Sequence, residues 1–183
     1  MKHVGTINIE TERLILRSFK KTDALDMYNN WANDERVTRY LTLLPHESIE
    51  ESEQICELWE KESSLMNKYQ WIIILKESNK AIGSIGAVNI YEDTKALEVG
   101  YCIGYDYWGK GYVKEALIDI LKVFKEVGFV RVFAEHDVEN PNSGKVLEKC
   151  GFEYEGTARK SIYNHERVLV DMAIYSIIFE ENI

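Results

Sequence analysis

The clearest pattern of apolar and polar positions in the chain lies between residues 111 and 127. Apolar side chains recur there three and four positions apart, and charged side chains fill most of the positions between them. This spacing gathers the apolar side chains on one face, which predicts an amphipathic helix over 111–127. The side chains that share this face are Val113, Ala116, Leu117, Ile120, Leu121, Phe124 and Val127. Gly128 follows immediately and is expected to end the helix.

Shorter patterns predict the remaining elements. Helices are expected over 22–33, over 48–64 and from about 141 to 150, and Ser48 and Glu51 have the spacing of a capping box. Runs rich in apolar, β-branched or aromatic residues predict strands over 12–19, 70–75, 81–91, 95–103, 130–136, 152–160 and 166–178. Strands lie on both sides of the 111–127 helix in sequence, so we expect an α/β fold with a mixed sheet and helices on its faces.

Composition and charge limit the partners. The chain has 183 residues, which suits one domain, and its 22 Lys and Arg against 31 Asp and Glu give a net charge of −9. No basic run occurs, so nucleic acid is not an expected partner, because binding to phosphates needs clustered positive charge. We expect a cytoplasmic protein without membrane association, since there is no signal-peptide core and no run near the ~18 apolar residues of a membrane span. The three cysteines and four histidines are scattered, which predicts neither a disulfide framework nor a metal site.

The stretch GYDYWGKGYV, residues 104–113, joins a predicted strand to the 111–127 helix. Gly104, Gly109 and Lys110 have the spacing of a P-loop, but Gly111 stands where that motif needs Ser or Thr to hold Mg²⁺. Glycines before the positive end of a helix suit an anion in any case. Three interpretations remain at this point: a glycine-rich turn without a ligand, a nucleoside-triphosphate site, which the bulky aromatic residues of the loop disfavour, and a site for another phosphate.

The segments WGKGYV (108–113) and ENPNSGKVLEKCGF (139–152) together resemble the acetyl-CoA-binding motifs of the GNAT acetyltransferases. With TERLILRSF near the start and VLVDMAIYSI near the end, the similarity spans about residues 10–178, and it is strongest to the RimJ/RimL-like branch that acetylates the N-termini of ribosomal proteins. Two loop positions depart from the general motif, since Trp108 replaces Gln or Arg and Val113 replaces Gly or Ala. The resemblance implies one domain over 1–183 with the GNAT acyl-CoA acyltransferase fold, a mostly antiparallel sheet flanked by helices.

The same resemblance implies where acetyl-CoA binds. The loop would hold its diphosphate without a metal, through residues Trp108, Gly109, Lys110, Gly111, Tyr112 and Val113. In GNAT proteins the pantetheine arm runs beside the preceding strand, which implies contacts with the backbone of Tyr101, Cys102 and Ile103. Asn140 resembles the family's asparagine that bonds the pantetheine amides, and the alternative is that it only forms the turn before Pro141.

Side chains alternate along the strand 95–103, so that one face is bulky and the other is nearly bare. Glu98 is the only charged side chain on the bare face. Acetyl transfer to an amine needs a proton acceptor, and Glu98 is therefore the candidate general base, with Glu135 and His136 in reserve. The alternative is that Glu98 is a solvated carboxylate on a strand.

A proton source for the departing thiolate is the other catalytic requirement. Many GNAT enzymes carry a Tyr four residues before the Gly-Phe of this motif, where this chain has Leu147. The ribosomal-protein branch places a Ser beside the sulfur of CoA, and the resemblance therefore implies Ser143 as the catalytic acid. The alternative for Ser143 is a helix cap.

These features predict an enzyme that moves an acetyl group from acetyl-CoA directly to an amine. The resemblance favours a protein N-terminal α-amine of the ribosomal-protein type and, since relatives are often dimers, a possible homodimer. Trp31 and Tyr40 are candidates to line the acceptor pocket, with a place in the core as the alternative. The other functions left open are acetylation of a small amine, such as an aminoglycoside or a polyamine, and CoA binding without catalysis.

Overall fold

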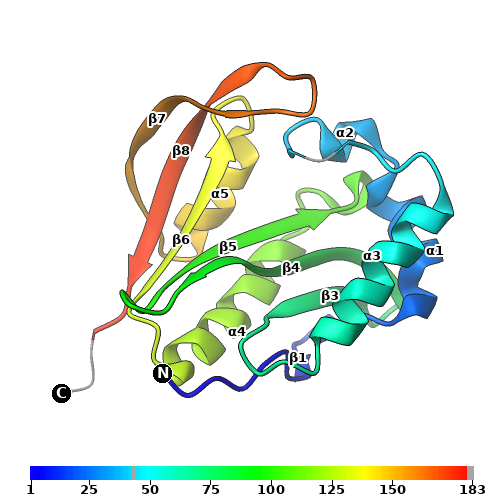
Figure 1. Cartoon of the computed structure of the whole chain (residues 1–183), viewed down its shortest axis with the longest axis horizontal. Helices are drawn as coiled ribbons and strands as arrows, with labels where there is room; N and C mark the ends of the chain where they lie inside the picture. Colours follow the sequence, from blue (N-terminus) through cyan, green and yellow to red (C-terminus); the bar gives the residue numbers. More distant parts are fainter. Residues whose placement is uncertain (43, 181–183) are drawn as a thin grey trace.

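Eight strands form one sheet in the computed structural model, which describes residues 1–42 and 44–180. The strands run in the order β1-β2-β3-β4-β5-β6-β8-β7, and every neighbouring pair is antiparallel except the parallel pair β5 and β6. The predicted mixed, mostly antiparallel sheet is confirmed (Figure 1). The strands are β1 (Ile9–Glu10), β2 (Leu14–Arg17), β3 (Gln70–Leu75), β4 (Lys80–Tyr91), β5 (Ala96–Ile103), β6 (Arg131–Asp137), β7 (Glu153–Tyr163) and β8 (Leu169–Ile178).

Helices cover both faces of the sheet. A larger buried cluster packs α4 and α5 against one face, and a smaller cluster packs α1, α3 and the π-helical turn η2 against the other. The helices and turns are η1 (Lys21–Asp23), α1 (Ala24–Met27), η2 (Tyr28–Ala32), α2 (Glu35–Thr38), α3 (Ile49–Glu62), η3 (Tyr105–Tyr107), α4 (Tyr112–Val127) and α5 (Pro141–Lys149). In the described part of the chain, no helix is long and apolar enough to cross a membrane.

Helix α4 is the element that the sequence pattern predicted most clearly, and it is confirmed. All of its predicted apolar positions are buried against the sheet. Gly111 precedes the helix with a φ of +80° and Gly128 ends it with a φ of +102°, a left-handed conformation that glycine adopts without a steric penalty. The helix connects β5 to β6, and this connection allows these two strands to run parallel.

The predicted helix over 22–33 is confirmed as a continuous helical segment over 21–32, but the type of helix changes along it. The segment divides into the 3₁₀ turn η1, one turn of α1 and the π-helical turn η2, and the short helix α2 follows it. Asp23 fixes the start of the segment, because its carboxylate accepts hydrogen bonds from the Arg17 guanidinium (2.7 and 2.8 Å) and from the Lys20 N–H (2.8 Å). The start of the segment is therefore held to β2 by tertiary contacts rather than by helical periodicity.

The predicted capping box of α3 is wrong in its contacts. Ser48 is the N-cap residue, but its side chain makes no capping hydrogen bond. The Glu51 carboxylate instead accepts from the N–H of Glu47 at 3.0 Å, one residue before the position that a capping box requires. The helix itself is confirmed.

The parallel pairing of β5 and β6 is short, and the candidate active site lies where it ends. It consists of three residue pairs and ends where Glu98 lies opposite Phe133. Beyond this point the strands separate (Figure 1), while β5 stays paired with β4 and β6 stays paired with β8. A bulge disturbs the register of β4 beside Glu98, and bulges bend strands. We call the separated segments, residues 99–103 of β5 and 134–137 of β6, the fork.

Candidate active site

The loop between β5 and α4 presents backbone N–H groups at the start of a helix. Gly109 and Gly111 both have positive φ angles, +72° and +80°, and a side chain at position 109 would meet no atom within 4 Å. The first helical hydrogen bond runs from the N–H of Glu115 to the carbonyl of Gly111 (3.0 Å), so the three N–H groups between them have no partner within the helix. This open, glycine-lined helix start fits a diphosphate.

Of the other loop residues, three pack against the protein and one is an exposed positive charge. Trp108 is half-buried, and its indole Nε1 donates to the carbonyl of Ile103 at 2.8 Å. Tyr112 and Val113 are buried at the start of α4, and both belong to the larger core cluster. The side chain of Val113 therefore fills the core and not the loop. Lys110 is exposed, with its Nζ 5.6 Å from the centre of the Tyr107 ring.

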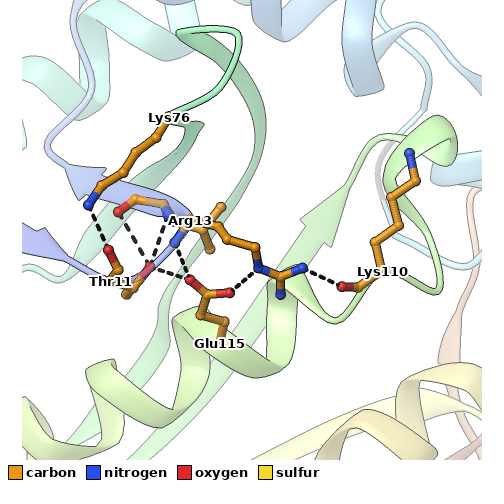
Figure 2. Close-up of polar contacts among 6 residues, drawn as sticks. Thr11, Arg13, Lys76, Lys110 and Glu115 are labelled. Atoms are coloured by element: carbon orange, nitrogen blue, oxygen red, sulfur yellow. Dashed lines mark hydrogen bonds and ion pairs between the residues drawn. The ribbon is translucent and has the colours of Figure 1, made fainter.

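An ion pair from the start of the chain supports this loop (Figure 2). Arg13 donates from Nη1 to the carbonyl of Lys110 (2.9 Å) and from Nε to Oε2 of Glu115 (2.7 Å). Oε1 of Glu115 also accepts from the backbone N–H of Arg13 (2.8 Å) and from the hydroxyl of Thr11 (2.6 Å). Partial burial opposes ionisation of Glu115, but these hydrogen bonds outweigh it and hold the pKa of its carboxyl below the ordinary value.

The sequence did not predict this contact, because Arg13 and Glu115 are far apart in the chain and no periodicity relates them. The one available signal was an acidic residue in the first turn of the predicted helix, where negative charge is favourable.

Backbone direction along β5 decides which of its amides face the fork. The N–H of Gly104 donates to Ile82 on β4 (2.8 Å), and alternation turns the amides of Gly100 and Cys102 the same way. The amides of Tyr101 and Ile103, both predicted contacts, therefore point toward β6.

Cys102 does not fit its predicted place. Its amide belongs to the β4 side, and its thiol lies on the face of the smaller core cluster, 3.4 Å from the hydroxyl of Ser84. Burial raises the pKa of this thiol. The alternation that brings Tyr101 and Ile103 to the fork thus removes Cys102 from it.

Two carboxylates lie on one face of the fork. Glu98 is opposite Phe133 in the parallel pairing, and Glu135 is two residues further along β6, so both side chains project to the same side. Asn89 donates to Oε2 of Glu98 at 2.6 Å. Partial desolvation and then the charge of Glu98 raise the pKa of Glu135, although its side chain is exposed in part. A carboxylate with a raised pKa is the stronger proton acceptor.

His136, the other reserve candidate, projects to the opposite face. Its ring is buried and stacks on Tyr175, with the ring centres 5.5 Å apart. Its Nδ1 lies 2.8 Å from the carbonyl of Asp137, and its Nε2 is directed at α5, where a side chain at position 144 would lie only 2.8 Å away. It is separated from Glu98 and Glu135 by the sheet.

The first turn of α5 brings Ser143 to the fork. Its hydroxyl oxygen lies 2.8 Å from the hydroxyl of Tyr101, so it is joined to β5 and does not cap the helix. Asn140 is the N-cap residue, and its side chain makes no capping hydrogen bond. Leu147 is fully buried in the larger cluster. The structure therefore brings Tyr101, Ser143 and Asn140 together; the contribution of the Tyr101 side chain was not predicted.

The two predicted acceptor-pocket residues differ in environment. Trp31 is 3% exposed and lies inside the smaller core cluster, so its prediction as a pocket residue is wrong. Tyr40 is half-buried, and the Arg39 guanidinium lies over its ring, 4.9 Å from the centre. Among the described residues no group of three or more His, Cys, Asp or Glu is placed to hold a metal ion.

A sheet that opens between two parallel strands, next to a helix start suited to a diphosphate, defines a class of acyltransferases that use coenzyme A. The model of the Acetyltransferase (GNAT) domain family matches residues 13–153, and the chain belongs to this family. It is an N-acetyltransferase with acetyl-CoA as donor and an amine as acceptor. The predicted GNAT fold and donor are confirmed, and the nucleoside-triphosphate interpretation of the loop is wrong.

Three similar proteins place the chain within the family. The uncharacterized N-acetyltransferase YoaA of Bacillus subtilis (strain 168) is 30% identical over 171 residues, which cover 93% of this chain and 96% of YoaA. The [ribosomal protein uS5]-alanine N-acetyltransferase of Escherichia coli (strain K12) is 25% identical, over 86% of this chain and 84% of that protein. The ribosomal-protein-S5-alanine acetyltransferase from Vibrio fischeri has a TM-score of 0.82 and 25% identity, over 94% of this chain and 96% of that one. The predicted similarity to ribosomal-protein acetyltransferases is confirmed.

Proposed function

We propose that this N-acetyltransferase modifies the α-amine at the N-terminus of a protein, of the ribosomal-protein type. The observation that carries the proposal is the pair of carboxylates, Glu98 and Glu135, on the partly exposed face of the fork. A negatively charged, open face suits the ammonium group at the end of a polypeptide chain. The names of two of the three similar proteins support the same acceptor class, an N-terminal alanine of a ribosomal protein.

The residues present fit acetyl-CoA. The helix start at Gly111 and the open position at Gly109 would receive the diphosphate, with Lys110 as an added positive charge. The amides of Tyr101 and Ile103 on β5 and the side chain of Asn140 would bond the pantetheine arm. This assignment retains all of the predicted acetyl-CoA-binding residues except Cys102. Within it, Trp108 and Val113 support the loop.

When bound, acetyl-CoA supplies a thioester carbonyl, at which the amine forms the new C–N bond while the C–S bond breaks and its electron pair leaves with sulfur. We assign removal of the proton from the amine to the carboxylate pair, with Glu135 as the proton acceptor because its pKa is raised, and Glu98 as the charge that contributes to raising it. This differs in emphasis from the sequence prediction, in which Glu98 is the base. The Ser143 hydroxyl donates a hydrogen bond to the departing sulfur, and the thiolate takes its proton from water.

Thiol release with defined acceptors tests the proposal. Acetyl-CoA is supplied with a peptide that carries an N-terminal alanine, with the same peptide whose α-amine is already acetylated, and with spermidine or an aminoglycoside. The expected result is release of CoA with the free peptide alone, and mass spectrometry should place the acetyl group on the α-amine. Turnover with only the small amines would overturn the acceptor class but not the enzyme class.

A thermal-shift measurement tests the binding of acetyl-CoA separately from the acceptor class. Acetyl-CoA at ~100 times its Kd stabilises a protein by about 2.7 kcal/mol, whereas Mg·ATP is expected to have no effect. Absence of any shift with acetyl-CoA would contradict the assignment of the loop.

A further inference from the structure

A tyrosine hydroxyl joins the β5 side of the fork to the first turn of α5. Tyr101 comes from the bulky face of β5, and its hydroxyl oxygen lies 2.8 Å from Oγ and 3.2 Å from the carbonyl oxygen of Ser143 in the first turn of α5. The N–H of Ser143 donates to the carbonyl of Asn140 at 3.1 Å, which fixes its backbone. The side chain of Ser143 is thus held on one side by the helix and on the other by Tyr101.

The number of hydrogens on the two hydroxyl groups limits what they do. Each hydroxyl has one hydrogen to donate and accepts through its oxygen. The Tyr101 hydroxyl donates to the carbonyl oxygen of Ser143 at 3.2 Å, and when the same hydrogen is shared with Oγ at 2.8 Å, the hydroxyl hydrogen of Ser143 is left to be donated elsewhere. Because Ser143 lies beside the fork, this hydrogen can then be donated to an atom of a substrate bound there.

We propose that Tyr101 is a positioning residue, which orients the hydroxyl of Ser143 so that it donates a hydrogen bond to the sulfur of coenzyme A. This inference rests on the proposed function, which places that sulfur beside Ser143. Tyr101 acts through Ser143 and does not touch the reacting atoms. It gives up no proton, so the proton balance of the transfer is unchanged.

Burial of the phenol agrees with this role. Desolvation raises the pKa of Tyr101 above its ordinary value, more than the hydrogen bond with Ser143 lowers it. Transfer of its proton to a thiolate, whose conjugate acid has a pKa of about 8.5, is therefore unfavourable. A phenol that stays protonated throughout the cycle orients its neighbour at every pH at which the enzyme works.

The pKa of the thiol of bound CoA measures the proposed hydrogen bond directly and needs no acceptor. Thiolate absorbs in the ultraviolet, so the titration is followed as the difference between enzyme with CoA and enzyme alone. The enzyme's own thiols are present in both samples, and burial raises the pKa of Cys56 to about 12 and of Cys150 to about 11, and raises that of Cys102. The Cys150 thiol, whose charge also acts on Tyr101, is present in every variant.

The variants are Tyr101→Phe, Ser143→Ala and the double variant. In the unaltered enzyme we expect bound CoA to have a thiol pKa below the ~8.5 of an ordinary thiol, because a donor favours the thiolate. Ser143→Ala should raise this pKa, and Tyr101→Phe should raise it by roughly 0.5, as expected for weakening one neutral hydrogen bond. The double variant should match Ser143→Ala, and Tyr101→Phe should lower kcat roughly threefold with little change in KM.

Tyr154→Phe is the matched control. Tyr154 makes the same kind of contact, with its hydroxyl 2.6 Å from Oγ1 of Thr157, on β7. This variant should leave the thiol pKa unchanged, and the melting temperatures of all variants show whether the fold is kept.

Three results would overturn the inference or its basis. An unchanged thiol pKa in Tyr101→Phe, or an equal rise in the Ser143→Ala background, would show that Tyr101 does not act through Ser143. An unchanged pKa in Ser143→Ala, with CoA bound, would remove the assigned role of Ser143 and that of Tyr101 with it. Failure of the unaltered enzyme to bind CoA would instead overturn the proposed function.

Discussion

The two faces of the fork differ in charge and in how their side chains are held. On the face of α4 and α5, Tyr101 and Ser143 carry neutral hydroxyl groups that join β5 to α5 at 2.8 Å. On the other face, Glu98 and Glu135 are carboxylates, and Glu135 is exposed in part. In the proposed mechanism the neutral face handles the leaving sulfur, and the charged, open face handles the amine proton. An open, charged face would suit the proposed acceptor, the N-terminus of a polypeptide.

The strongest test of this division is Glu135→Gln. Loss of the proton acceptor should lower kcat by about 10²–10³-fold, within the usual range for a general base, while acetyl-CoA still binds. Steady-state kinetics and a thermal shift with acetyl-CoA measure the two effects separately. Glu139→Gln, at an exposed residue just beyond β6, is the matched control. A large loss in Glu98→Gln together with full activity in Glu135→Gln would return the base to Glu98.

Arg13→Gln tests the loop that holds the donor. It removes charged hydrogen bonds to Glu115 and weakens the hold on the Lys110 carbonyl, so KM for acetyl-CoA should rise about tenfold. Activity with S-acetyl-N-acetylcysteamine, a thioester without the diphosphate, should stay unchanged.

Arg17→Gln is the control for this test. Arg17 is the last residue of β2, the strand that follows Arg13, and it pairs with Asp23 at 2.7 Å. Arg17→Gln should therefore lower stability and affect the activity with the two donors equally. Equal losses with both donors in Arg13→Gln would show that Arg13 acts on the fold as a whole.

Glu98→Gln should move the pH profile rather than abolish activity. The negative charge of Glu98 helps raise the pKa of Glu135, and its removal lowers that pKa toward the ordinary value. The base then stays deprotonated to lower pH, so the acid limb of the kcat/KM profile should shift to lower pH. A shift to higher pH, or none, would contradict the proposed coupling of the two carboxylates.

The smallest effect is expected away from the fork, at Glu155. Hydrogen bonds from Arg131 and Ser176 lower the pKa of its carboxyl from 4.5 to about 2. Because the pKa is lower in the folded state, this stabilisation is present above pH 4.5 and is lost as the pH falls toward 2. The melting temperature of Glu155→Gln should lie slightly below that of the unaltered enzyme at pH 7, since the pair is partly exposed, and the two should converge near pH 2. The kcat of Glu155→Gln at pH 7 should be unchanged, in contrast to that of the variants at the fork.

Sequence patterns predicted the elements in which apolar and polar residues recur at a regular spacing of a few positions. The apolar face of α4, the strands before and after it and the glycine-containing turn between β5 and α4 all follow from spacings of a few residues, and they are confirmed. The contact of Arg13 with Glu115 and that of Tyr101 with Ser143 join distant residues, and no local spacing indicates them. The change from 3₁₀ to α to π geometry along residues 21–32 is likewise not indicated by the sequence pattern. Homodimer formation stays a prediction.

The position of β8 has a consequence for how the site is assembled. β8 is the last strand in chain order, yet it lies between β6 and β7 and pairs with all seven residues of β6. Until β8 has been synthesised and has paired, one edge of β6 is open along its whole length, and such edges bind other chains readily. The fork therefore acquires a fixed second side only when the final strand inserts. A chain cut within residues 169–178 is expected to lose activity and gain a tendency to aggregate in the same event.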